Sequence, residues 1–71
     1  MSELRRLRKN RGLTQAELAR RVGVNQSLIA SIELGYYRPY PKIKKRIAEV
    51  LGVLPEDIWP EAGVGKEAPE A

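Results

Sequence analysis

Residues 14–35 read TQAELARRVGVNQSLIASIELG, and this stretch predicts two short helices joined at Gly23. Thr14 and Glu17 form a capping box, in which the threonine hydroxyl and the glutamate carboxylate each accept a backbone N–H of the other residue. Asn25 is a favoured N-cap for the second helix. Gly23 suits the turn, because glycine adopts a left-handed backbone at little cost.

The two predicted helices also carry the side chains that a tight crossing requires. Helices that cross at roughly 90–120° need a small residue where their backbones approach, and Ala19 supplies it. The apolar residues that remain can share one core: Leu18, Val22, Val24, Ile29 and Ile32. This pattern predicts a helix-turn-helix.

Once its apolar residues are buried, the second helix keeps an uncharged face of Gln26, Ser27, Ala30 and Ser31. A glutamine amide can bind the N6 and N7 atoms of adenine, and an alanine methyl can touch a thymine methyl. The two serines are short enough to allow close approach. The alternative is an ordinary solvent face, although other exposed faces of this chain are rich in Arg and Lys. We therefore expect these four residues to contact DNA bases.

Further helices are expected on both sides of this unit. Ser2 can cap a helix over residues 2–11, whose many basic residues have a simple interpretation as a solvated face. Pro41 suits the first position of a helix over residues 41–51, and one more helical turn is expected over residues 54–59. Trp59 is expected to plug the core, with a stacking platform for a ligand as the alternative.

The start of the predicted helix at Pro41 carries Lys42, which opposes the helix dipole. A DNA phosphate bound there would reverse the sign of that interaction. Tyr36, Tyr37 and Arg38 lie in the loop just before and are expected to contact the same DNA backbone. A solvated lysine is the alternative interpretation.

Composition limits the other possibilities. The 71 residues suit one small domain, and the lack of cysteine and histidine excludes disulfides and the commonest zinc sites. We expect no metal, no cofactor and no catalytic site. No apolar run approaches the roughly 20 residues of a membrane span, so a cytoplasmic location is expected. The net charge of +4 favours a polyanionic partner such as nucleic acid.

The sequence closely resembles the lambda-repressor-like helix-turn-helix family, of the Cro and Xre type. The similarity lies in LTQAELA at 13–19, GV at 23–24, the pattern S-x-I-x-x-I-E-x-G at 27–35, the region of Pro39, and IAEVLGV at 47–53. It implies an all-α, compact five-helix DNA-binding domain over residues 1–59. Residues 60–71, rich in Gly, Pro, Ala and Glu, are expected to form a disordered tail.

The resemblance also implies roles for single residues. The recognition helix would run from Asn25 to Leu34 in the major groove, with Gln15 and Asn25 contacting the DNA backbone. Arg8 and Glu33 stand where the family often has a buried ion pair between the first and third helices.

The chain departs from the family pattern at three positions. Tyr40 and Leu54 replace the usual capping residues, so the fourth and fifth helices are expected to be poorly capped. Lys44 replaces a residue that is often apolar, which predicts looser packing at the start of the fourth helix.

Together these features predict a sequence-specific regulator of transcription, acting as a repressor and binding double-stranded DNA as a homodimer. One alternative is a DNA-binding antitoxin, which uses the same fold. Another is a protein-interaction module, which predicts binding to protein that is insensitive to salt and no binding to DNA.

Overall fold

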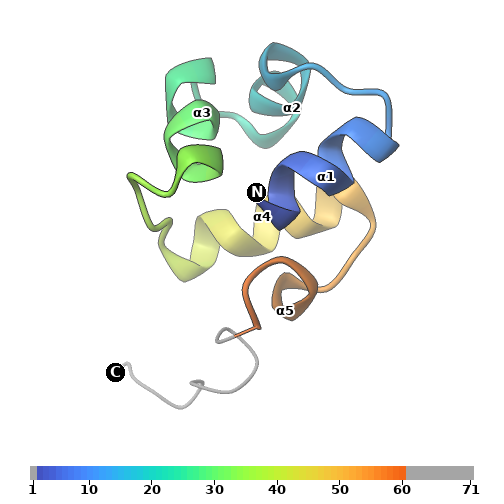
Figure 1. Ribbon diagram of the computed structural model, residues 1–71, viewed down its shortest axis with the longest axis vertical. Coiled ribbons are helices and arrows are strands. Elements are labelled where there is room, and N and C mark those ends of the chain that lie inside the picture. The colour runs from blue at the N-terminus through green and yellow to red at the C-terminus, as the bar shows by residue number, and fades with distance from the viewer. Residues whose placement is uncertain (1, 61–71) are drawn as a thin grey trace.

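The computed structural model describes residues 2–60, and all regular structure in this range is α-helical (Figure 1). The helices are α1 (Glu3–Asn10), α2 (Gln15–Val22), α3 (Gln26–Leu34), α4 (Pro41–Leu51) and α5 (Pro55–Ile58). The prediction of an all-α, five-helix domain is confirmed. The tail expected over residues 60–71 lies, except for Pro60, outside the described residues.

The first three helices begin at the residues that their sequence signals indicate. Ser2 caps α1. At α2, the Thr14 hydroxyl accepts the Glu17 N–H at 3.0 Å and the Glu17 carboxylate accepts the Thr14 N–H at 2.8 Å. This bond from the Thr14 backbone lowers the pKa of the Glu17 carboxyl. The Asn25 Oδ1 atom caps α3.

The last two helices start differently. Tyr40 precedes α4 and offers no side-chain cap, as expected from its lack of a suitable acceptor. For α5 the expectation of poor capping was incomplete, because the Asp57 carboxylate accepts the Leu54 N–H at 2.9 Å. Asp57 therefore supplies from inside the helix a bond that Leu54 cannot make with its own side chain.

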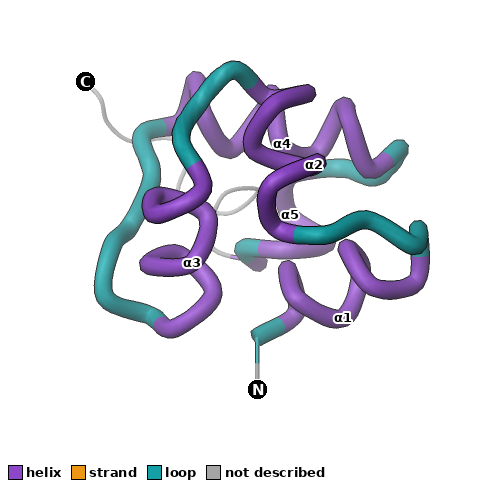
Figure 2. Tube along the Cα trace, turned by 90° about the horizontal axis from the view of Figure 1, so that it is seen from above, coloured by secondary structure: helices purple, strands orange, loops and turns teal. Residues whose placement is uncertain are grey.

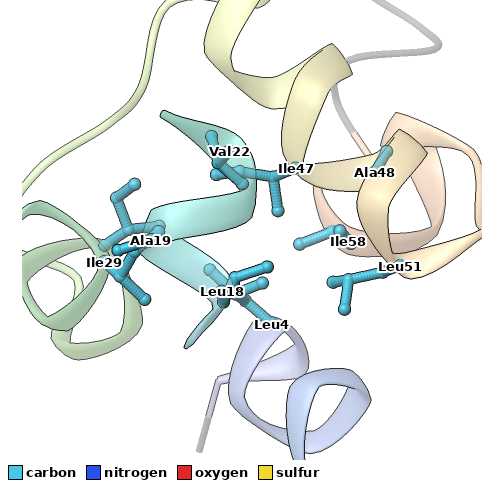
Figure 3. Packing of buried hydrophobic residues seen from close by; sticks show 10 residues of the cluster. Leu4, Leu18, Ala19, Val22, Ile29, Ile47, Ala48, Leu51 and Ile58 are labelled. Atoms are coloured by element: carbon cyan, nitrogen blue, oxygen red, sulfur yellow. The ribbon is translucent and has the colours of Figure 1, made fainter. Parts of the chain in front are cut away.

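The core lies where α2 packs against α3 and α4 (Figure 3). Ala19 is 2% exposed, in keeping with its place at the crossing of α2 and α3. α1 and α5 also contribute residues to this core. The buried apolar residues are Leu4, Leu18, Ala19, Val22, Ile29, Ile32, Ile47, Ala48, Leu51 and Ile58.

Two glycines at helix ends lie under arginine side chains from other parts of the chain. Gly23 has φ +93°, and a Cβ atom there would lie 3.2 Å from the Arg46 guanidinium. Gly52 has φ +71°, and a Cβ atom there would lie 2.7 Å from the Arg11 guanidinium. Each glycine therefore provides both a left-handed backbone and room for a cation near the carbonyl end of a helix, where a cation is favourable.

Trp59 packs against the core just after α5, as expected of a plug. The Lys44 ammonium lies over its ring, with Nζ 5.8 Å from the ring centroid, within the range of a cation–π contact. Lys44 is only half-buried. The start of α4 thus places a lysine over an aromatic ring, at a position that is often apolar in the family.

Candidate nucleic-acid interface

The solvent side of α3 carries the residues that the sequence singled out for base contacts. Gln26 and Ser27 in its first turn are exposed, and Ala30 and Ser31 are half-buried. The first turn contains no acidic residue. The one charged residue of this helix, Glu33, has a side chain that is only 4% exposed. Apart from Leu34 at its last position, which is 66% exposed, the exposed side of α3 is therefore uncharged and built from short side chains around one glutamine.

Glu33 turns inward and joins α3 to α1. Its Oε2 atom accepts the Arg8 Nε–H at 2.6 Å, and its Oε1 atom accepts the Arg8 Nη2–H at 3.2 Å. Arg8 also donates to the backbone carbonyl of Leu13 at 2.8 Å. Arg8 and Glu33 thus form a two-pronged buried ion pair, at the positions for which the family resemblance implied one.

Gln15, at the first position of α2, is a third member of this cluster. Its Nε2 atom donates to Glu33 Oε1 at 3.1 Å. The sequence interpretation gave Gln15 only a phosphate contact and missed this bond. Because an amide nitrogen carries two N–H groups, the second one remains available for DNA. The same bond holds Gln15 in a fixed orientation next to α3.

Asn25 also has two uses. Its Oδ1 atom accepts the Leu28 N–H at 2.9 Å and caps α3. The side-chain NH₂ group is a separate donor on the same amide. The residue is exposed at the turn between α2 and α3, so capping and a contact to DNA are compatible.

The loop between α3 and α4 places its predicted contacts unequally. Tyr36 is 82% exposed, whereas Tyr37 is half-buried and packs against the core. Arg38 and Lys42 are exposed. The first turn of α4 contains no acidic residue and lacks a side-chain cap. No side chain in that turn therefore compensates the positive end of the helix dipole. Tyr37 therefore has a packing role that the sequence interpretation did not assign.

An open groove runs between α1 and α3, which lie beside each other below α2 in Figure 2. It contains two cations that the sequence interpretation left as part of a solvated face, Arg5 and Lys9. The sequence signal that could have identified them as a pair is their four-residue spacing on one helix. The residues that line the groove are Ser2, Arg5, Arg8, Lys9, Gln15, Ala30, Ile32, Glu33, Leu34 and Gly35.

Comparison with known families decides what this arrangement is. The family described as helix-turn-helix matches residues 4–58, which cover α2 to α5 completely and α1 except for its first residue, Glu3. The chain belongs to the lambda-repressor-like helix-turn-helix family. In this DNA-binding helix-turn-helix domain, α2 and α3 are the paired helices and α3 is the second of the pair. No helix in the described part of the domain is long and apolar enough to cross a membrane.

The domain is similar to curated proteins of archaea and of a phage. An uncharacterized HTH-type transcriptional regulator of Methanothermobacter thermautotrophicus is 49% identical over 49 residues, covering 69% of this chain and 71% of the relative. One from Methanocaldococcus jannaschii is 40% identical over 58 residues, covering 82% and 88%. A negative regulator of transcription from Escherichia phage D108 is 37% identical over 52 residues, covering 73% and 67%. No solved structure matches the chain.

Proposed function

We propose that this helix-turn-helix domain is a sequence-specific regulator of transcription that binds double-stranded DNA with α3 in the major groove. The observation that carries the proposal is the uncharged exposed side of α3 in a domain that is otherwise rich in exposed Arg and Lys. A helix that reads base edges needs donors and acceptors of short reach, while charge is better placed on the phosphates beside it.

In this proposal Gln26, Ser27, Ala30 and Ser31 face the base edges. The DNA backbone is held on both sides of them. Gln15 and Asn25 contact phosphates at the starts of α2 and α3. Residues after α3 contact a further stretch of the DNA backbone. These later contacts are Tyr36, Tyr37, Arg38 and Lys42.

We further propose that the protein is a repressor that acts as a homodimer. The phage relative, a negative regulator of transcription, supports the first part. Dimers of this kind bind two half-sites about one helical turn apart, roughly 34 Å.

The experiment that tests this function is selection of bound DNA from a random duplex library, followed by titration of the selected sequence at several salt concentrations. We expect a defined motif whose two halves are related by two-fold symmetry. Recovery of no motif, with weak binding of equal strength to all duplexes, would show that α3 does not read sequence. A single unrepeated half-site would contradict the homodimer.

Gln26→Ala is expected to cost about 1–3 kcal/mol of binding free energy on the selected sequence and to relax preference at one base pair. The reason is loss of an amide that both donates to and accepts from a base edge. Titration against the selected duplex and its single-base variants measures both effects. The control is Asn10→Ala, which removes an exposed amide from α1. An equal loss on every duplex would instead make Gln26 a backbone contact.

Lys42→Ala is expected to weaken binding to all sequences alike and to reduce the slope of log affinity against log salt by about one. The reason is that a lysine bound to a phosphate releases about one counterion from the DNA. The control is Arg21→Ala, an exposed cation in the last turn of α2 that removes the same charge. If both variants had the same slope, Lys42 would lie outside the interface.

A further inference from the structure

We propose that the groove between α1 and α3 is an additional phosphate-binding site, in which Arg5 and Lys9 hold the DNA backbone. This inference rests on the proposed function, because it extends the DNA-binding surface beyond α3 and the loop after it. The ligand class is the phosphodiester backbone of duplex DNA, which the site contacts without regard to sequence.

The first observation is the position of the groove. Its lining includes Gln15 and Ala30, which are a proposed phosphate contact and a proposed base contact. The same depression continues to Arg5 and Lys9 on α1. A duplex seated on α3 therefore lies at the mouth of a groove whose far wall is α1.

The second observation is the arrangement of the cations on that wall. Arg5 and Lys9 are four residues apart, so they project from the same side of α1. Four residues correspond to about 6 Å along the helix axis. Both side chains are exposed, and both can extend toward a strand that passes along the groove.

The third observation is that these two charges are not neutralised by neighbours. Within residues 2–60 the ion pairs are Glu3 with Arg6 and Glu33 with Arg8. The hydrogen bond from Arg6 lowers the pKa of the Glu3 carboxyl, so Arg6 already has an anionic partner. Arg5 and Lys9 take part in neither pair.

The carboxylate in the groove does not neutralise these two cations either. Glu33 is the sole carboxylate among the lining residues, and it already accepts three hydrogen bonds from Arg8 and Gln15. An anion that enters the groove therefore meets two uncompensated cations and no exposed carboxylate. An acidic segment of a protein would match the charge as well, but continuity with the base-reading face favours DNA.

The test compares two double variants that remove the same net charge. Arg5→Ala with Lys9→Ala removes the proposed site, and Arg20→Ala with Arg21→Ala removes two exposed cations of α2 that do not line the groove. Each is titrated with the selected duplex and with an unrelated duplex between 50 and 200 mM salt. Thermal melting establishes that both are folded.

We expect the first pair to reduce the salt slope by about two, so that its affinity falls roughly 10-fold less than that of the wild type over this range. The loss at low salt should be equal on both duplexes. If the first pair matched the α2 pair in slope, DNA would not occupy the groove, and the proposed function would stand without it. If the wild type showed no salt-dependent binding to any duplex, the proposed function itself would fail, and this inference with it.

Discussion

Arg8→Ala is expected to lower the free energy of unfolding by about 3–5 kcal/mol, the usual cost of breaking a buried ion pair by removing one partner. The variant leaves the Glu33 carboxylate, whose side chain is 4% exposed, with Gln15 as its remaining side-chain donor. It also removes the donor to the Leu13 carbonyl. For a domain of this size the melting temperature should fall by about 12 °C or more, measured by circular dichroism.

A matched double variant separates the cost of an unpaired charge from the value of the pair. Arg8→Met with Glu33→Leu replaces both partners by apolar side chains and should recover most of the lost stability. Gln15 loses its hydrogen-bond acceptor in that variant. The DNA affinity of the double variant should therefore remain below that of the wild type even when the protein is fully folded. A loss below 1 kcal/mol for Arg8→Ala alone would mean that Glu33 reaches water in solution.

Ile29→Ala is expected to lower the free energy of unfolding by about 2–5 kcal/mol. Ile29 is fully buried on α3 and faces the core (Figure 3), so the substitution loses apolar contact and leaves a cavity between α3 and its neighbours. Chemical denaturation followed by circular dichroism measures the change. Binding to DNA should fall only as far as the fraction of folded protein falls, because Ile29 does not face the solvent.

Two control variants test whether the loss of stability in Ile29→Ala comes from its buried position. Ile29→Val keeps the branched shape and should cost about 0.5–1.5 kcal/mol. Leu34→Ala alters an α3 side chain that is 66% exposed and should change stability by no more than about 0.5 kcal/mol. If Ile29→Ala and Leu34→Ala were equally stable, the inward side of α3 would have been assigned incorrectly.

Most of the fold could be predicted because its signals are local. The capping box at Thr14 and Glu17, the Asn25 cap and Pro41 each specify a helix start within four residues of sequence. The turn at Gly23 follows from backbone conformation alone. Such features do not depend on how the helices are oriented, so they can be identified before any packing is known.

The candidate site was less predictable because its contacts span the chain. The bond from Gln15 to Glu33, which was not expected, joins residues 18 positions apart, and the Arg8–Glu33 pair, which joins residues 25 apart, was expected only from the family resemblance. Long side chains reach such partners only after the helices have been placed. For that reason Arg5 and Lys9 were interpreted from the sequence as part of a solvated face. The groove is apparent only once α1 is placed beside α3.

The contact between Lys44 and Trp59 has a practical consequence for spectroscopy. The chain contains one tryptophan, so all indole fluorescence originates from the point where α4 meets the end of α5. The ring also lines a depression together with Tyr37 and Arg38 of the loop after α3. Emission from this unlabelled chromophore therefore reports on two events, the opening of the core and the rearrangement of that loop when a duplex is added.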